Sequence, residues 1–417
     1  MASMSMSVRI RLSIMMFLQF MLFAVWSVPL AAYLNTLGLS GFERSLALSS
    51  MAIGCLASPI IGMIADRYFA SQKVLAVLNL LGAGFLFAAA YMTSPVSVTV
   101  LLVLQQLCYM PTWGLTSAIA MSHSPSDKFP QIRVFGTVGW VASGLFSLAA
   151  LSIWGAKIDG TYIPLLCGAG TSLVAALLAL ALPDTPPPAK GKKASIVDAL
   201  GLRSFALLKD PSFAVFMAIS LLVMIPFSLY WWYGSAFLKD KGFEFITITM
   251  NWGQAVEMFF ILLVPVALAK LGIKWTMVIG LVALVARYAF FLAGGACDQS
   301  WMYFGAILVH GAIFGFFFVG GQVYVDKKAP PELRAQAQGL IFLMTFGLGL
   351  LVGTFINGAL IEAYTTTVGV GAEATKVYEW GPIWTITTIS CVVLLAAFLV
   401  FFRPKVAEQA AAAQGGA

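Results

Sequence analysis

Three ionisable side chains lie inside long apolar stretches of this sequence: Glu257, Arg287 and His310. Each stands about nine to twelve residues into its stretch, close to half the depth of a bilayer core of about 30 Å at about 1.5 Å per helical residue. An ionisable group that faces lipid without a partner costs several kcal/mol. We therefore expect these three groups to face the protein interior and to contact one another.

Such a cluster has two interpretations. The one we favour is a site near the membrane midplane that binds substrate and couples its movement to a proton. The other is an ion pair between Glu257 and Arg287 that only fixes helix packing, with His310 as a hydrogen-bonded core residue. Gln254 lies one helical turn before Glu257 on the same face and could add an amide to the site.

Motifs of common catalytic and energy-coupling sites do not occur in the sequence. It contains no GxxxxGK[ST] phosphate loop, which argues against ATP-driven pumping. It contains neither HExxH nor GxSxG, which argues against a hydrolase. The five cysteines form no CxxC pair and predict no metal site. We therefore expect no enzyme activity and no cofactor, and an ion gradient remains as the energy source.

The composition predicts that these residues are held by membrane-spanning helices. Hydrophobic residues make up 60% of the chain and charged residues 10%, against about 25% charged residues in globular domains. Backbone groups in hydrocarbon must be satisfied within the segment, so long apolar runs are expected to be helices. Twelve such runs occur, at about 12–34, 44–65, 74–92, 97–121, 131–154, 162–182, 212–238, 246–269, 275–296, 301–325, 336–361 and 380–402.

The longest polar stretch divides the twelve runs into six and six. It begins with PDTPPP at 183–188 and continues through several lysines to Pro211, a composition typical of a linker. We predict an all-α membrane protein of two six-helix bundles. Its parts are a first bundle at 1–183, a cytoplasmic linker at 184–211, a second bundle at 212–403 and a cytoplasmic tail at 404–417.

Lysines and arginines predict the orientation in the membrane. If the N-terminus is cytoplasmic, 18 of the 24 basic residues fall in cytoplasmic segments and five in outer loops, with Arg287 inside a span. Such a bias is typical of cytoplasmic loops, so both termini are expected in the cytoplasm. It also accounts for the net charge of +7 without a nucleic-acid partner.

The loop between the second and third spans resembles a motif of the major facilitator superfamily. It reads GMIADR at 62–67, which matches the GxxxDR pattern of that superfamily. The resemblance implies the fold of two six-helix bundles. It also implies that Asp66 and Arg67 act as a charge pair in a cytoplasmic gate.

Within that superfamily the chain is similar, nearly end to end, to the nucleoside:proton symporters. The matching segments are FLQF at 17–20, YMPT at 109–112, FPQIRVFGT at 129–137, QAVE at 254–257 and RAQAQG at 334–339. By this resemblance the substrate pocket comprises Arg133, Thr137, Trp140, Gln254, Glu257, His310 and Phe314. Proton coupling is expected of Glu257, Arg287 and His310.

The chain departs from that family at several positions. An acidic residue in the tenth span of the family corresponds to Gly315, and two amide side chains in the seventh span correspond to Ser228 and Trp231. The segment from Arg133 to Trp140, together with Glu257, Arg287 and His310, also resembles the lactose permease group. A sugar or glycoside substrate therefore stays open.

The function expected from these resemblances is a proton-coupled symporter that imports nucleosides across a bacterial inner membrane by alternating access. A proton-coupled glycoside symporter is the alternative, and a membrane sensor that does not transport is a third. The expected partners are the small-molecule substrate, protons and the lipid bilayer, and the chain is expected to be a monomer.

The charge bias makes the first testable prediction. Reporter fusions after Lys193 and after Lys405 should both report a cytoplasmic location, because both positions lie in basic segments. A periplasmic signal from the Lys193 fusion would contradict the division into six plus six spans.

Overall fold

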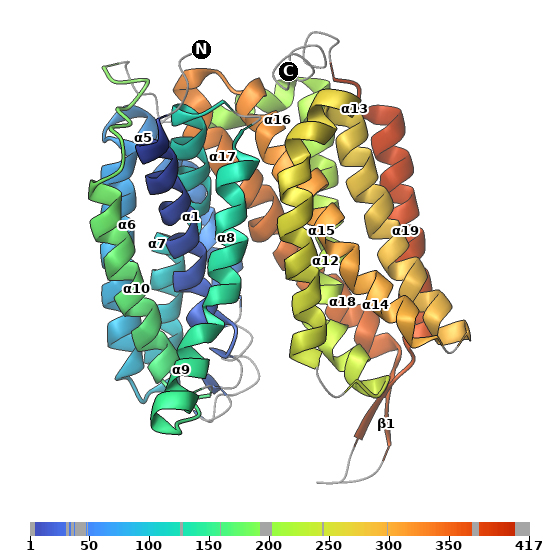
Figure 1. Cartoon of the computed structure of the whole chain (residues 1–417). Coiled ribbons are helices and arrows are strands. Elements are labelled where there is room, and N and C mark those ends of the chain that lie inside the picture. The colour runs from blue at the N-terminus through green and yellow to red at the C-terminus, as the bar shows by residue number, and fades with distance from the viewer. Residues whose placement is uncertain are drawn as a thin grey trace. The chain divides into compact units, whose positions relative to one another are not determined.

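The structure is a computed structural model that describes residues 5–30, 33–34, 37, 47, 49–125, 128–158, 160–191, 202–243, 246–297, 299–368 and 375–404. Parts of three predicted segments lie outside the described residues. They are the start of the second span (44–46 and 48), residues 192–201 of the linker and residues 405–417 of the tail. The described chain is almost entirely helical, as Figure 1 shows.

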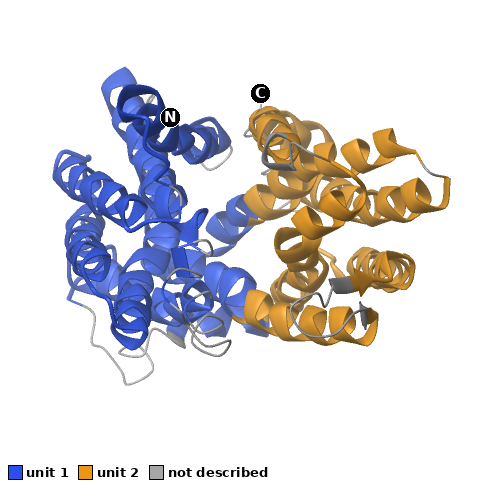
Figure 2. Ribbon diagram, turned by 90° about the horizontal axis from the view of Figure 1, so that it is seen from below, with its two compact units in different colours: residues 1–209, 322–347 blue, residues 210–321, 348–417 orange. Residues whose placement is uncertain are grey.

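Two compact units make up the chain, coloured separately in Figure 2. The first comprises residues 1–209 and 322–347, and the second comprises residues 210–321 and 348–417. The predicted linker ends close to the boundary at residues 209 and 210. Assigning 322–347 to the first unit was not predicted, and the predicted domain limits themselves stay a prediction.

The helices of the first unit include five that are long and apolar enough to cross a membrane, together with shorter pieces. They are α1 (Met6–Ser27), α4 (Ser50–Gly54), η1 (Cys55–Ala57), α5 (Ser58–Arg67), α6 (Ser71–Ala90), α7 (Pro95–His123), α8 (Pro130–Ala142), α9 (Gly144–Trp154), α10 (Ile163–Leu180), η2 (Leu202–Lys209), η4 (Pro331–Leu333) and α17 (Arg334–Phe342).

The second unit contains long helices, shorter helices that follow one another directly, and two strands. Its elements are α12 (Pro211–Asp240), α13 (Ile246–Cys297), α14 (Ser300–Leu308), α15 (His310–Ala312), η3 (Ile313–Val319), α18 (Leu350–Ala363), β1 (Thr365–Val368), β2 (Thr375–Tyr378) and α19 (Trp380–Phe401). Two elements straddle the limits of the units, α16 (Gly320–Lys328) and the π-helix η5 (Leu343–Gly349).

Ten of the described helices could span a membrane, against twelve predicted spans. One difference is α13, whose 52 residues would extend about 78 Å as a single helix, far more than a bilayer core of about 30 Å. Gly272 interrupts it with φ 71° and ψ 175°, so α13 contains the predicted eighth and ninth spans. The other is the second span, which is divided among α4, η1 and α5. The predicted fold class is confirmed.

A short hairpin between α18 and α19 was not predicted. Strands β1 and β2 pair antiparallel, with Thr365 opposite Tyr378. Both strands are rich in threonine and valine, which favour extended backbone. The sequence predicts only a connection between two spans here, because four-residue strands carry little periodic signal.

A seam of glycines joins α13 to the helix that carries His310. A Cβ atom on Gly311 would lie 2.6 Å from the backbone carbon of Val256 and 2.7 Å from the backbone nitrogen of Glu257. A Cβ atom on Gly315 would lie 3.0 Å from the backbone carbon of Phe260. A side chain at Gly311 would clash, and one at Gly315 would require Phe260 to shift, so both glycines allow the two backbones to approach closely.

The seam makes the second prediction. Gly311→Ala should lower the melting temperature of the purified protein clearly, because overpacking a close contact typically costs about 1–3 kcal/mol. The matched control is Gly358→Ala in α18, where a Cβ atom would meet nothing within 4 Å. Equal melting temperatures for the two variants would show that the close approach at Gly311 is not required.

Candidate functional site

In the second unit, Glu257 and Arg287 both lie close to His310. Nη2 of Arg287 lies 2.7 Å from Nδ1 of His310, and Nε2 of His310 lies 3.4 Å from Oε2 of Glu257. The amide nitrogen of Gln254 lies 3.3 Å from the same Nε2 atom. Four predicted site residues from α13 and α15 therefore form one cluster.

The contact with Arg287 determines which nitrogen of His310 carries the proton. A guanidinium can only donate hydrogen bonds, so Nδ1 must accept and must be unprotonated. In a neutral ring, Nε2 then carries the hydrogen and donates it to the carboxylate of Glu257. With this tautomer, the amide nitrogen of Gln254 and Nε2–H of His310 would both be donors. The Gln254 amide can therefore accept from Nε2–H only when its oxygen, and not its nitrogen, faces the ring. His310 thus connects a permanent positive charge to a carboxylate.

Aromatic rings surround the buried Arg287, whose side chain is 0% exposed. Its Cζ atom lies 4.3 Å from the ring centroid of Tyr230 and 5.8 Å from that of Phe227. Ring faces attract cations, more strongly where water is excluded. The two rings therefore offset part of the cost of burying this charge, and the carboxylate of Glu257 supplies the opposite charge through His310.

Two phenylalanine rings, one of them Phe227 again, pack against the imidazole. Phe227 stacks on His310 with ring centroids 5.7 Å apart, and Phe314 lies on it at 6.3 Å. Neither Phe227 nor Tyr230 was predicted as a site residue. Their spacing of three residues on α12 puts both on one helix face, but aromatic residues are too common in apolar helices for that spacing alone to single them out.

In the first unit, α8 carries the other three residues of the predicted pocket. Arg133 is buried, and its Cζ atom lies 4.1 Å from the ring centroid of Phe20 on α1. Gly136 makes room for it, because a Cβ atom there would lie 2.7 Å from Nη1 of Arg133. Thr137 is buried on the same helix. Trp140 is half-buried and contacts Phe23 edge-on at 5.8 Å.

A buried polar network ties α1 to α6 and α7 behind these residues. Nε2 of Gln19 donates to Oγ1 of Thr112 at 2.6 Å, and the Gln19 amide exchanges hydrogen bonds with Asn79 at 3.2 Å. The hydroxyl of Tyr109 donates to the carbonyl oxygen of Gln19 at 2.7 Å. Gln19, Tyr109 and Thr112 belong to the segments that carry the family resemblance, so those segments meet in space.

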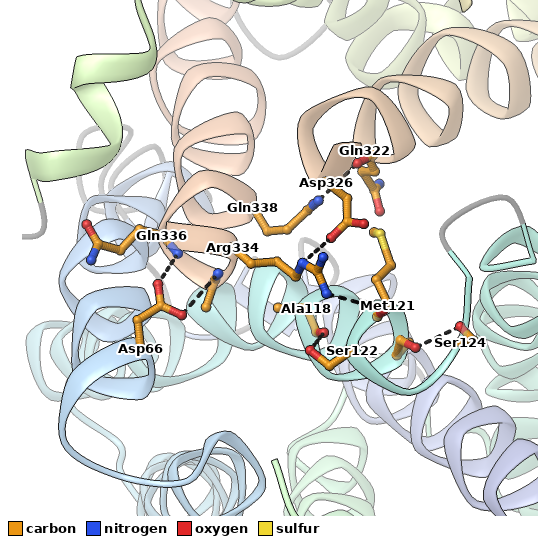
Figure 3. A network of polar contacts seen from close by, with 12 residues as sticks. Asp66, Ala118, Met121, Ser122, Ser124, Gln322, Asp326, Arg334, Gln336 and Gln338 are labelled. Atoms are coloured by element: carbon orange, nitrogen blue, oxygen red, sulfur yellow. Dashed lines mark hydrogen bonds and ion pairs between the residues drawn. The ribbon is translucent and has the colours of Figure 1, made fainter. Parts of the chain in front are cut away.

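Asp66, one of the two predicted gating residues, caps the first turn of α17, as Figure 3 shows. Its carboxylate accepts hydrogen bonds from the backbone N–H groups of Ala335 at 3.3 Å and Gln336 at 3.0 Å. Gly62 permits this approach, because a Cβ atom there would lie 2.9 Å from the carbonyl oxygen of Ala335. Arg67 is buried beside Asp66. A carboxylate at a helix N-terminus is stabilising.

Arg334, the first residue of α17, is held by a second set of contacts in Figure 3. Its Nε atom lies 2.8 Å from the carboxylate of the buried Asp326, and Nη1 donates to the carbonyl oxygen of Met121 at 3.5 Å. The segments GMIADR and RAQAQG, distant in sequence, therefore meet within the first unit. The gating role of Asp66 and Arg67 stays a prediction.

The seven predicted pocket residues divide between the two units. Arg133, Thr137 and Trp140 lie in the first, whereas Gln254, Glu257, His310 and Phe314 lie in the second. In the first unit the three residues follow one another on α8, and in the second the four residues come together from α13, α15 and η3. That they complete one pocket stays a prediction.

Two positions where the chain departs from the family are explained by packing. The Ser228 hydroxyl is buried and lies 2.9 Å from Nδ2 of Asn357 on α18, so it belongs to the contact between α12 and α18. At Gly315, the backbone of Phe260 occupies the space that a side chain would need. Trp231 contacts Phe227 with ring centroids 6.0 Å apart, next to the histidine cluster.

The cap on α17 makes the third prediction. Asp66→Ala should lower the melting temperature, because loss of an N-cap acceptor costs about 0.5–2 kcal/mol. Asp66→Asn keeps one acceptor oxygen and should lose less. Asp184→Ala is the control, since its carboxylate accepts a hydrogen bond from a side chain, that of Gln72, at 2.6 Å. Equal losses for Asp66→Ala and Asp66→Asn would exclude the capping role.

Comparison with known proteins identifies relatives that match almost the whole chain. The model of the nucleoside H+ symporter family matches residues 6–407. The YegT protein of Escherichia coli (strain K12) is 39% identical, over 94% of this chain and 93% of the relative. The nucleoside permease NupG of the same organism is 31% identical, over 96% of this chain and 97% of NupG.

Solved structures agree with the family match. The crystal structure of the nucleoside transporter NupG has a TM-score of 0.67 with 31% identity, covering 96% of this chain and all of that one. The proton:xylose symporter XylE of the major facilitator superfamily has a TM-score of 0.68 with 13% identity, covering 97% and 99%, and supports the fold alone. The predicted resemblance is confirmed: the chain is a multi-pass membrane protein that belongs to the nucleoside H+ symporter family and has the fold of the major facilitator superfamily.

Proposed function

We propose that the chain imports nucleosides together with protons across a bacterial inner membrane, with Glu257 as the group that takes up the proton. The observation that carries this proposal is the contact of Glu257 with His310, which in turn contacts the buried Arg287. Membership of the nucleoside H+ symporter family supports the substrate and the coupling ion.

The proposed coupling follows from charge balance. When Glu257 is ionised, it accepts the hydrogen bond from Nε2 of His310 and balances the positive charge of Arg287. When Glu257 takes up a proton, that balance is lost, and a buried charge without a partner is strongly destabilised. The protonated carboxyl also becomes a hydrogen-bond donor. Proton uptake thus changes both the stability of the cluster and what it offers to a substrate.

His310 serves in this scheme as a fixed connection and not as the proton carrier. A second proton on the ring would have to bind Nδ1, 2.7 Å from a nitrogen of Arg287. Two donors would then face each other beside a permanent positive charge, which disfavours the charged imidazole. The ring can become charged only after it has moved away from Arg287.

Gly315 supports the assignment of the proton to Glu257. The family resemblance implies an acidic residue at this position, but a Cβ atom on Gly315 would already lie 3.0 Å from the backbone of Phe260. A side chain here would require the backbone of Phe260 to shift, so the glycine serves the close approach of the two helices. Coupling in this chain therefore depends on the carboxylate that remains at mid-depth.

The proposed substrate contacts use the chemistry of a nucleoside. A ribose presents hydroxyl groups, which suit the carboxylate of Glu257 and the amide of Gln254. A nucleobase presents a flat face, which suits the indole of Trp140 and the ring of Phe314. Arg133 and Thr137 add hydrogen-bond donors.

The proposed orientation places both chain termini in the cytoplasm, on the bias of lysines and arginines between the two sets of loops. The chain is proposed to work as a monomer, and no resident cofactor is proposed.

A proton-coupled glycoside symporter is the second candidate. The arrangement of Glu257, His310 and Arg287 in contact favours it, because it resembles the expected cluster of the lactose permease group. Uptake of labelled uridine and of a labelled galactoside into vesicles with and without a pH gradient separates the two. Gradient-driven uptake of the galactoside alone would replace the nucleoside proposal.

The fourth prediction tests the proton carrier. Glu257→Gln should abolish accumulation of uridine against its gradient, because an amide cannot exchange a proton, while downhill exchange persists. Glu257→Asp keeps a carboxylate and should retain part of the accumulation. The measurement is the ratio of internal to external uridine in vesicles with an imposed pH gradient. Accumulation by Glu257→Gln equal to that of the wild type would contradict the assignment.

A further inference from the structure

A groove of about 410 Å³ runs along the contact between α1 and α8 in the first unit. Its wall is apolar and exposed: Ile10 is 50% exposed, Ile14 is 41% exposed and Phe135 is 40% exposed. The groove is lined by Met6, Arg9, Ile10, Ser13, Ile14, Phe17 and Phe135.

The position of this groove on a membrane-spanning helix indicates lipid. Its lining on α1 extends from Met6 to Phe17, a length of about 16 Å at about 1.5 Å per residue. Its first residues precede the span predicted at about 12–34, and Phe17 lies about 8 Å inside that span at about 1.5 Å per residue. The groove therefore begins at the membrane surface and enters the core by about a quarter of its thickness of about 30 Å, where the headgroup and the first part of an acyl chain of one leaflet lie.

The mouth of the groove is positively charged. Arg9 lines the groove, and its side chain is exposed. Its Nη2 atom donates a hydrogen bond of 3.2 Å to the side-chain oxygen of Gln131 on α8. This contact joins the first turns of α1 and α8, and neither turn contains an acidic residue. Both helices thus direct the positive ends of their dipoles toward the same surface.

We propose that this groove binds a phospholipid with an anionic headgroup. One acyl chain lies along Ile10, Ile14 and Phe135, and the headgroup phosphate is bound by the guanidinium of Arg9. Basic pockets between membrane helices on the cytoplasmic side commonly bind such headgroups. The proposal does not depend on which solute the chain transports.

The groove is continuous with the contact that positions Arg133. Beyond Phe17, α1 and α8 approach so closely that a Cβ atom on Gly139 would clash with the carbonyl oxygen of Phe17. A lipid in the groove fills the same interface one to two turns nearer the helix ends. The lipid would therefore hold α1 and α8 together between Arg133 and the N-terminal ends of the two helices.

The experiment compares lipid binding to the purified full-length chain by native mass spectrometry. The probes are dioleoyl phosphatidylglycerol, which is anionic, and dioleoyl phosphatidylcholine, which has the same acyl chains. Phosphatidylglycerol should bind more tightly to the wild type. Arg9→Gln should weaken its binding about fivefold, since a basic residue at the membrane surface contributes about 1 kcal/mol, and should leave phosphatidylcholine binding unchanged.

The matched control is Arg11→Gln, two residues further along the same helix. Arg11 donates to the carbonyl oxygen of Ala181 at 2.9 Å and is not part of the groove lining, so its loss should not change phosphatidylglycerol binding. Equal weakening by Arg9→Gln and Arg11→Gln would show a general attraction of surface charge and would overturn the proposed site.

A second variant tests the acyl-chain half of the site. Ile14→Trp fills the groove and should weaken binding of both lipids; if it does not fold, Ile10→Trp in the same wall makes the same test. Unchanged lipid binding by the folded variant would overturn the proposal. So would displacement of phosphatidylglycerol by millimolar inorganic phosphate, because the site would then bind a free anion.

Discussion

The buried positive charge of Arg287 is the constraint on which the second unit depends. A guanidinium cannot lose its proton in a protein, and this one is 0% exposed. Its charge must be balanced inside the helices. The structure does so with two ring faces and, through the neutral imidazole of His310, with the carboxylate of Glu257. The glycine at position 311 is what allows the carboxylate to come within reach.

This arrangement gives a physical basis for coupling without a second acidic residue. In the proposed mechanism Arg287 keeps its charge, since a guanidinium does not lose its proton, and protonation of Glu257 changes the balance. The π-helix η3 begins three residues after His310, and such segments are frequent at functional sites. In the first unit another guanidinium is buried against a ring face, since Arg133 lies against Phe20 in space that Gly136 leaves open.

Much of this could be predicted from the sequence, and the limits have physical reasons. Glu257, Arg287 and His310 stood out because charge is rare at mid-depth, and their contact followed from the cost of facing lipid. The rings of Phe227 and Tyr230 could not be singled out among so many aromatic residues. Nor could the sequence distinguish Gly311, which sets a backbone approach, from Gly358, where an added Cβ atom would meet nothing within 4 Å, because both are simply glycines in apolar helices.

Tertiary contacts account for the other differences. Ser228 stands where the resemblance implies an amide side chain, and its hydroxyl is bound to Asn357 on a neighbouring helix. Residues 322–347 belong to the first unit, where Asp66 caps α17 and Gly62 lies against it. These are long-range contacts that a linear pattern does not contain. The fold class and family, by contrast, rest on hydropathy and on motifs spread over the whole chain.

The central claim is that Glu257 balances the charge of Arg287 through His310, and a double-mutant cycle tests it most directly. The melting temperatures of Glu257→Gln, Arg287→Gln and the double variant should be measured in the same detergent. Each single variant leaves one buried charge without its counterpart and should be strongly destabilised, whereas the double variant removes both charges and should recover much of the loss. Losses that simply add in the double variant would show that the two charges do not depend on each other, and would contradict the account.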